Sequence, residues 1–258
     1  MTPGQLAELL GEPPAPEGDW TREAVYLSAA ALRRRVDPGE LAASVPGAVA
    51  LPNGLLRIVL PEPADVLAEV FAVADQGWPE TPLTWDNPGF VVKYARARAV
   101  AVAREAAALG VPGAPGMPGA PGVPGAPAVP GAPAAPGLLG ASGAPAVSGV
   151  PGAPGAPGAS GGLGASGGFG ASGGFEPARL SGARDRAVLR VLAELPGRRV
   201  SAEPGWAAFL VRLALAYHDA YEHAAPLPVG DEPASPVHTA RVRLALAVQE
   251  VLPGPDRI

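Results

Sequence analysis

The stretch NPGFVVKYARARAVAVAREA, from Asn87 to Ala106, gives the clearest helix signal in this chain of 258 residues. Asn87 suits the N-cap position, where a short polar side chain accepts a hydrogen bond from the first turn, and Pro88 suits the first helical position. Gly110 and the prolines that follow it stop a helix. We therefore predict one long helix that runs from Pro88 to about Leu109.

This predicted helix gathers positive charge within an acidic protein. The chain has 19 basic and 24 acidic side chains, and its only lysine, Lys93, lies here with three arginines. At 100° per residue, Lys93, Arg96 and Arg104 fall on one face, opposite a small apolar face. Tyr94 and Arg98 lie at the flank of the cationic face. A solvated surface and a nucleic-acid contact both explain this pattern, and Arg98 also suits a structural ion pair.

Three later segments repeat apolar residues at helical spacing. They are ARDRAVLRVLAEL at 183–195, WAAFLVRLALAYHDAYEHAA at 206–225 and PVHTARVRLALAVQEVL at 236–252. Together with the first helix they predict a helical bundle, in which short connections favour antiparallel neighbours. Tyr217 falls on the apolar stripe of its helix, so we predict that it lies in the core.

The N-terminal segment has a different pattern. Asp37 and Pro38 are typical of a helix start, and VALPNGLLRIVLP at 49–61 places a turn before a short strand. We predict a small α+β unit over residues 1–62. The bundle then occupies residues 63–109 and 175–258.

The middle of the chain, residues 110–174, has no charged side chain and repeats glycine at most third positions. That period is the one a collagen triple helix needs, but three of its glycine positions hold alanine, so we predict a flexible, low-complexity insertion instead. Matches to G-x-S-x-G at 158–162 and to G-x-G-x-x-G at 162–167 lack the flanking strand and helix that give these motifs their chemistry. They predict neither an esterase nor a dinucleotide site.

Several classes of site and location are disfavoured by what the sequence lacks. There is no cysteine, and His218 and His223 are five residues apart, which does not suit a metal site on a helix. We therefore expect no metal and no cofactor. We see neither a signal peptide nor an apolar stretch long enough to span a membrane, so we expect a cytoplasmic protein.

The helix signal also carries a family resemblance. DNPGFVVKYARAR at 86–98 resembles the motif that opens the DALR anticodon-binding domain of arginyl-tRNA synthetases. The matching residues are Asn87, Pro88, Val92, Tyr94, Ala95, Ala97 and Arg98, with Phe90 as an aromatic replacement. The later helices are similar to later segments of that domain, and the segment 18–60 resembles the family's additional N-terminal domain, which binds the elbow of tRNA.

This resemblance implies a mainly α protein that consists of a helical anticodon-binding bundle, a small N-terminal α+β unit and the insertion. It also implies a tRNA partner, which for this family is tRNA-Arg, and an aminoacyl-tRNA synthetase as a second partner. Between Leu60 and Trp85 there is no room for a catalytic domain with its ATP-binding motifs, so we expect no ligase activity. The residues expected to bind tRNA are Asn87, Lys93, Tyr94, Arg96, Arg98, Arg104, Tyr221 and Arg57.

Departures from the family pattern leave other functions open. The family's Gln and His in Q-Y-A-H-A-R are Lys93 and Arg96 here, and an Asn of its elbow-binding strand appears as Arg57. Base-reading groups have thus become cations that suit phosphates. One alternative is an auxiliary factor in arginyl-tRNA aminoacylation. Another is a protein-interaction scaffold that has lost RNA binding, which the net charge of −5 favours.

Overall fold

The computed structural model describes residues 1–79, 81–113 and 175–254, and about 52% of these residues are helical. The predicted low-complexity insertion lies outside the described residues from residue 114 onward, and so do the two glycine-rich motif matches within it.

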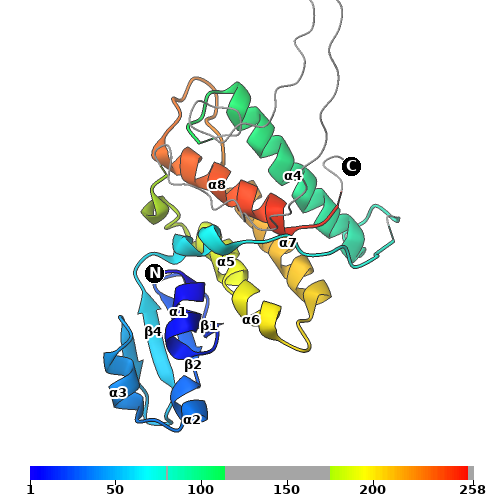
Figure 1. Cartoon of the computed structure of the whole chain (residues 1–258). Helices are drawn as coiled ribbons and strands as arrows, with labels where there is room; N and C mark the ends of the chain where they lie inside the picture. The colour runs from blue at the N-terminus through cyan, green and yellow to red at the C-terminus, as the bar shows by residue number, and fades with distance from the viewer. Residues whose placement is uncertain (80, 114–174, 255–258) are drawn as a thin grey trace, which may run out of the picture. The chain divides into compact units, whose positions relative to one another are not determined.

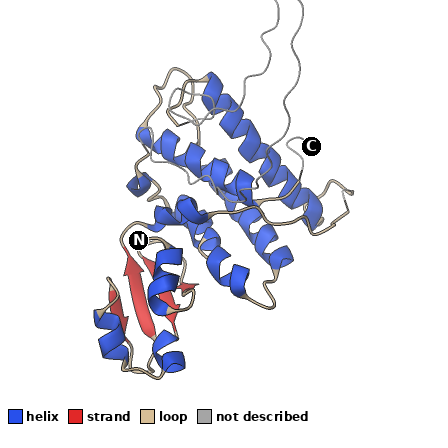
Figure 2. Ribbon diagram, in the orientation of Figure 1, coloured by secondary structure: helices blue, strands red, loops and turns tan. Residues whose placement is uncertain are grey.

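The N-terminal residues form a four-stranded antiparallel sheet with three short helices (Figure 2). The strands are β1 (Ala15–Glu17), β2 (Ala24–Ser28), β3 (Ala48–Ala50) and β4 (Leu56–Leu60), in the order β1-β2-β4-β3. The helices are α1 (Pro3–Leu10), α2 (Ala30–Arg34) and α3 (Pro38–Ala43). The predicted α+β unit and its helix start are confirmed, because Asp37 caps α3 by accepting a hydrogen bond from the backbone of Glu40.

The predicted turn at 52–54 joins β3 to β4 as a hairpin. Side chains alternate along β2 and β4 between buried and half-buried, as strands with one face on a core require. Tyr26 and Ile58 are paired across the two strands and both face this core.

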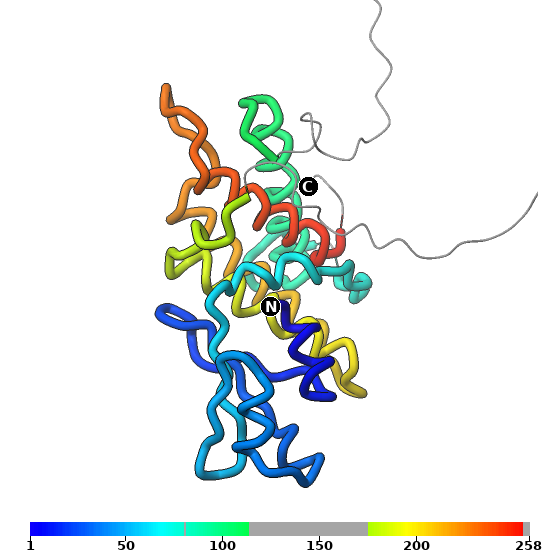
Figure 3. Tube along the Cα trace, turned by 60° about the vertical axis from the view of Figure 1, so that its left-hand side comes forward, coloured from blue at the N-terminus to red at the C-terminus, as the bar shows by residue number. Residues whose placement is uncertain are grey.

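The regular secondary structure of the remaining described residues is all helical (Figure 1). The elements are η1 (Pro63–Glu69), α4 (Pro88–Ala108), η2 (Pro177–Arg179), α5 (Ala183–Leu192), α6 (Leu195–Val200), α7 (Trp206–His223) and α8 (Pro236–Val251). Helix α4 packs against α7 and α8, and α5 packs against α7. Figures 1 and 3 both place α8 alongside α4.

The four long predicted helices are all present, and their apolar stripes are buried. The buried residues include Val188, Leu189, Leu192, Phe209, Leu213, Tyr217, Ala220, Leu244, Ala247, Val248 and Val251. Helix α6 was not predicted, because Pro196 and Gly197 interrupt the helical pattern. The proline is tolerated there because it occupies the first turn, where its missing N–H has no helical partner.

Glu194, between α5 and α6, joins three arginines. Its carboxylate accepts hydrogen bonds from Arg190, Arg198 and Arg212, at 2.8, 2.7 and 2.6 Å. Burial acts to raise the pKa of this carboxyl, but the three guanidinium groups outweigh it and hold the pKa at about 2. The ion cluster therefore fixes α6 to α5 and α7 whenever Glu194 is ionised.

We predict that acid weakens the fold through Glu194. Because its pKa is depressed in the folded state relative to the ordinary value of 4.5, its contribution is fully present above about pH 5 and is lost as the pH falls toward 2. Glu194→Gln should lower the free energy of unfolding by about 2 kcal/mol at pH 7 and flatten its dependence on pH below 4.5. Urea unfolding across a pH series measures both effects.

The matched control is Glu176→Gln. Glu176 pairs with Arg179 at the surface, with both side chains 52% exposed, and exposed pairs contribute about 0–1 kcal/mol. Equal pH curves for the two variants would contradict the role of Glu194.

Candidate functional site

One stripe of α4 carries two aromatic rings and a guanidinium group in a stack. Phe90, Tyr94 and Arg98 are spaced four residues apart, so they lie one above the next on the helix surface. The rings of Phe90 and Tyr94 stack with centroids 5.4 Å apart. The guanidinium of Arg98 lies 4.6 Å from the ring centroid of Tyr94 and 4.4 Å from that of Tyr221 on α7. We call these four residues the α4–α7 stack.

The Arg98 end of the α4–α7 stack is held by polar groups from α7. Arg98 donates a hydrogen bond to the Glu222 carboxylate, and its Nη1 lies 3.1 Å from Nδ1 of His218. The predicted structural ion pair of Arg98 is therefore confirmed. The hydrogen bond from Arg98 lowers the pKa of Glu222, so this carboxylate is ionised at neutral pH.

Trp85 adds an exposed ring to this cluster. It precedes α4, is 51% exposed, and packs on the imidazole of His218 with centroids 4.6 Å apart. Its ring also meets Phe90 and Tyr94 edge to face, at 5.7 and 5.5 Å. The cluster thus presents the exposed indole of Trp85 to solvent, with half-buried rings, a carboxylate and an imidazole around it.

The sequence predicted that the other cations of α4 share one face. In the structure these side chains do not form one open face. Arg96 is half-buried and donates to the backbone carbonyls of Gln249 and Leu252, at the C-terminal end of α8. The side chain of Lys93 lies against Gly254, where an added Cβ would be 2.9 Å from its Cγ. Arg104 is exposed. The structure differs from the prediction because the position of Arg96 around the helix axis lies at the edge of the face that α8 covers.

Asn87 and Arg57 lie outside the α4–α7 stack. Asn87 is buried and caps α4 through the backbone of Gly89, while its amide donates to the carbonyls of Pro79 and Pro82, at 3.1 and 2.8 Å. Its hydrogen-bonding groups are therefore used within the fold. Arg57, on β4, forms an ion pair of 2.7 Å with Glu23, which directly precedes β2.

Tyr217 is in the core, as predicted, and is 4% exposed. Its hydroxyl has no hydrogen-bond partner among the described residues. Burial raises its pKa, so it remains a neutral phenol at every physiological pH. Because its ring is buried, it offers nothing to a ligand at the surface.

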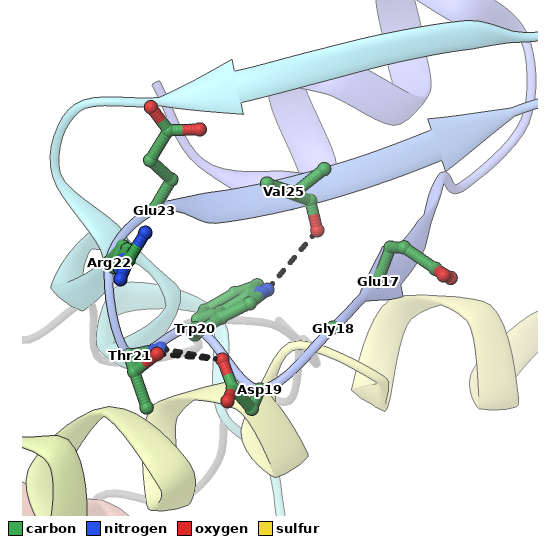
Figure 4. A pocket seen from close by; sticks show the side chains of 8 residues that line it. All are labelled: Glu17, Gly18, Asp19, Trp20, Thr21, Arg22, Glu23 and Val25. Carbon is green, nitrogen blue, oxygen red and sulfur yellow. Dashed lines mark hydrogen bonds between the residues drawn. The ribbon is translucent and has the colours of Figure 1, made fainter.

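The loop from Gly18 to Arg22 borders a hollow of about 360 Å³ (Figure 4). Its Trp20 is buried and donates from Nε1 to the carbonyl of Val25, at 3.1 Å. From α5, Arg186 donates to the Trp20 and Arg22 carbonyls. The loop backbone is thus fixed by internal contacts, and its indole is not offered to solvent.

Sequence reasoning missed Trp85, His218 and Glu222. The four-residue spacing of Phe90, Tyr94 and Arg98 was visible in the sequence and signals a common stripe. The packing of α7 against that stripe and against Trp85 was not visible, because it joins positions more than a hundred residues apart.

The described residues contain no group of three or more histidine, aspartate or glutamate side chains placed to hold a metal ion. None of their helices is both long enough and apolar enough to cross a bilayer. Comparison with protein-family models, with curated proteins and with solved structures finds no match to this chain.

We predict that Arg96 and Arg104 differ in their effect on stability. Arg96→Ala removes donors from carbonyls at the end of α8 and should lower the free energy of unfolding by about 2 kcal/mol, because hydrogen bonds from charged groups are strong. Arg104→Ala, on the same helix but exposed, should change it by less than about 0.5 kcal/mol. Urea unfolding at neutral pH distinguishes them, and equal losses would refute the internal role of Arg96.

Proposed function

We propose that this chain binds tRNA through the α4–α7 stack and Trp85, and that it does not itself charge tRNA. The observation that carries the proposal is the preformed cluster of Phe90, Tyr94, Arg98, Tyr221 and Trp85, with the exposed indole at its edge. Proteins hold unpaired bases by stacking them on aromatic rings and on guanidinium planes. This arrangement suits a single-stranded loop better than a duplex.

The family resemblance supports the same proposal from the sequence. The motif at 86–98 contains Phe90, Tyr94 and Arg98, which are the members of the stack on α4. In arginyl-tRNA synthetases the corresponding domain binds the anticodon. We therefore propose the anticodon loop of a tRNA as the ligand, with tRNA-Arg as the first to test. Because the chain lacks the ATP-binding motifs, we also propose an auxiliary role beside a complete synthetase. A cytoplasmic location is part of the same proposal.

Positive charge near the α4–α7 stack is limited, and this affects which contacts we expect to contribute most to RNA affinity. Arg98 is neutralised by Glu222, and Arg96 is directed to α8. Arg104, which is exposed, is the cation of α4 best placed for phosphates. We therefore expect stacking to contribute more to affinity than phosphate contacts do.

A second candidate function is a protein-interaction scaffold. It is favoured by the exposed apolar residues Leu83 and Trp85, at 61% and 51% exposed, and by the net charge of −5. Exposed tryptophan, tyrosine and arginine are also the residues that dominate protein interfaces.

We predict that the purified chain binds tRNA-Arg with an affinity that increases as salt is lowered, because each phosphate contact releases counterions. Fluorescence anisotropy with labelled tRNA-Arg and a control tRNA, across a salt series, measures this. Absence of binding at about 50 mM salt would reject tRNA binding in favour of the scaffold. Equal binding of both tRNAs would retain RNA binding and reject anticodon reading.

We predict that Trp85→Ala weakens tRNA binding by about tenfold, since one base stacked on an aromatic ring contributes about 1–3 kcal/mol. The melting temperature should change little, because the indole is half exposed and lies outside the helices. Val200→Ala is the matched control, since Val200 is 69% exposed on α6 and outside the cluster. Unchanged affinity in Trp85→Ala would remove the cluster from the binding site.

A further inference from the structure

The rim of the aromatic cluster includes one exposed carboxylate, that of Glu222. Glu222 is 45% exposed at its side chain, and its Oε1 lies 4.0 Å from Nδ1 of His218, the ring on which Trp85 packs. The carboxylate and the exposed indole therefore both lie beside the same imidazole. An ionised carboxylate accepts hydrogen bonds through both oxygens and donates none.

The pairing with Arg98 keeps Glu222 in this acceptor-only form. Arg98 is itself fixed between the rings of Tyr94 and Tyr221, so the carboxylate is anchored beside the cluster. Its hydrogen bond to Glu222 lowers the pKa of the carboxyl. A ligand thus meets an aromatic surface with a fixed negative acceptor at its edge.

The four RNA bases differ in how they suit such an acceptor. Guanine presents two adjacent donors, N1–H and the N2 amino group, which one carboxylate can accept together. Adenine and cytosine each place a ring nitrogen acceptor beside their amino group, and uracil flanks its single N–H with two carbonyl oxygens. These acceptors repel a carboxylate, so the rim favours one base and disfavours the other three.

We propose that the cluster selects an unpaired guanine, which stacks on Trp85 and donates its Watson–Crick edge to Glu222. This proposal rests on the proposed function, since it names the base that the RNA site prefers. A purine also covers more of an indole ring than a pyrimidine does, which acts in the same direction.

The test uses the full chain and four single-stranded oligonucleotides, each a short uridine run with one central guanine, adenine, cytosine or uridine. Fluorescence anisotropy should show that the guanine oligonucleotide binds about tenfold more tightly than the other three, since a good bidentate pair to a base edge gives discrimination of that order. Guanosine monophosphate should compete, and adenosine monophosphate should not.

Glu222→Gln separates selectivity from binding. The amide replaces one acceptor by a donor, so the preference for guanine should disappear while the uridine oligonucleotide binds as in the wild type or more tightly. Glu8→Gln, which makes the same charge change at an exposed position of α1, should keep the preference. Retention of the preference in Glu222→Gln would overturn the proposal.

The remaining outcomes distinguish guanine selection from RNA binding itself. If all four oligonucleotides bind equally to the wild type, guanine selection is wrong and RNA binding stands. If neither the oligonucleotides nor tRNA-Arg bind at low salt, the proposed function fails and guanine selection fails with it.

Discussion

The close packing of α4 against α7 and α8 is the constraint on which the rest of the helical part depends. The buried face of α4 consists of small side chains, among them Ala95, Ala99, Val102 and Ala106. Small residues let neighbouring helices approach closely, and the two partners bring Phe209, Leu213, Leu244 and Val248 into the same core. Two helices on one small face leave little of α4 free.

This packing determines the role of the cations at the two edges of that face. Arg96 lies at the α8 edge and supplies donors to carbonyls that the end of a helix leaves without partners. Arg98 lies at the α7 edge and becomes the centre of the α4–α7 stack, with Glu222 as its counter-ion. Two arginines that are two residues apart in the sequence thus serve different neighbours, and only one of them belongs to the candidate site.

Arginines on α5 also link this helix to other parts of the fold. Arg186 and Arg190 hold the loop Gly18–Arg22 through backbone carbonyls, and Arg190 contributes to the cluster around Glu194. One guanidinium group has several donors in a fixed plane, so it satisfies carbonyls and carboxylates at the same time. The fold therefore uses much of its arginine internally, which accounts for the limited positive charge left beside the aromatic cluster.

The sequence by itself determined the long helices, the hairpin, the cap at Asn87 and the core position of Tyr217. These features follow from local rules, namely helical and strand periodicity, turn residues and capping side chains, which act over a few residues. It also determined the spacing of Phe90, Tyr94 and Arg98. Only the tertiary structure decided that Trp85, His218 and Glu222 join the predicted Tyr221 in the candidate site and that Arg96 does not belong to it. The physical reason is that these contacts depend on which helix covers which edge of α4, and the residues that make them are separated by the whole middle of the chain.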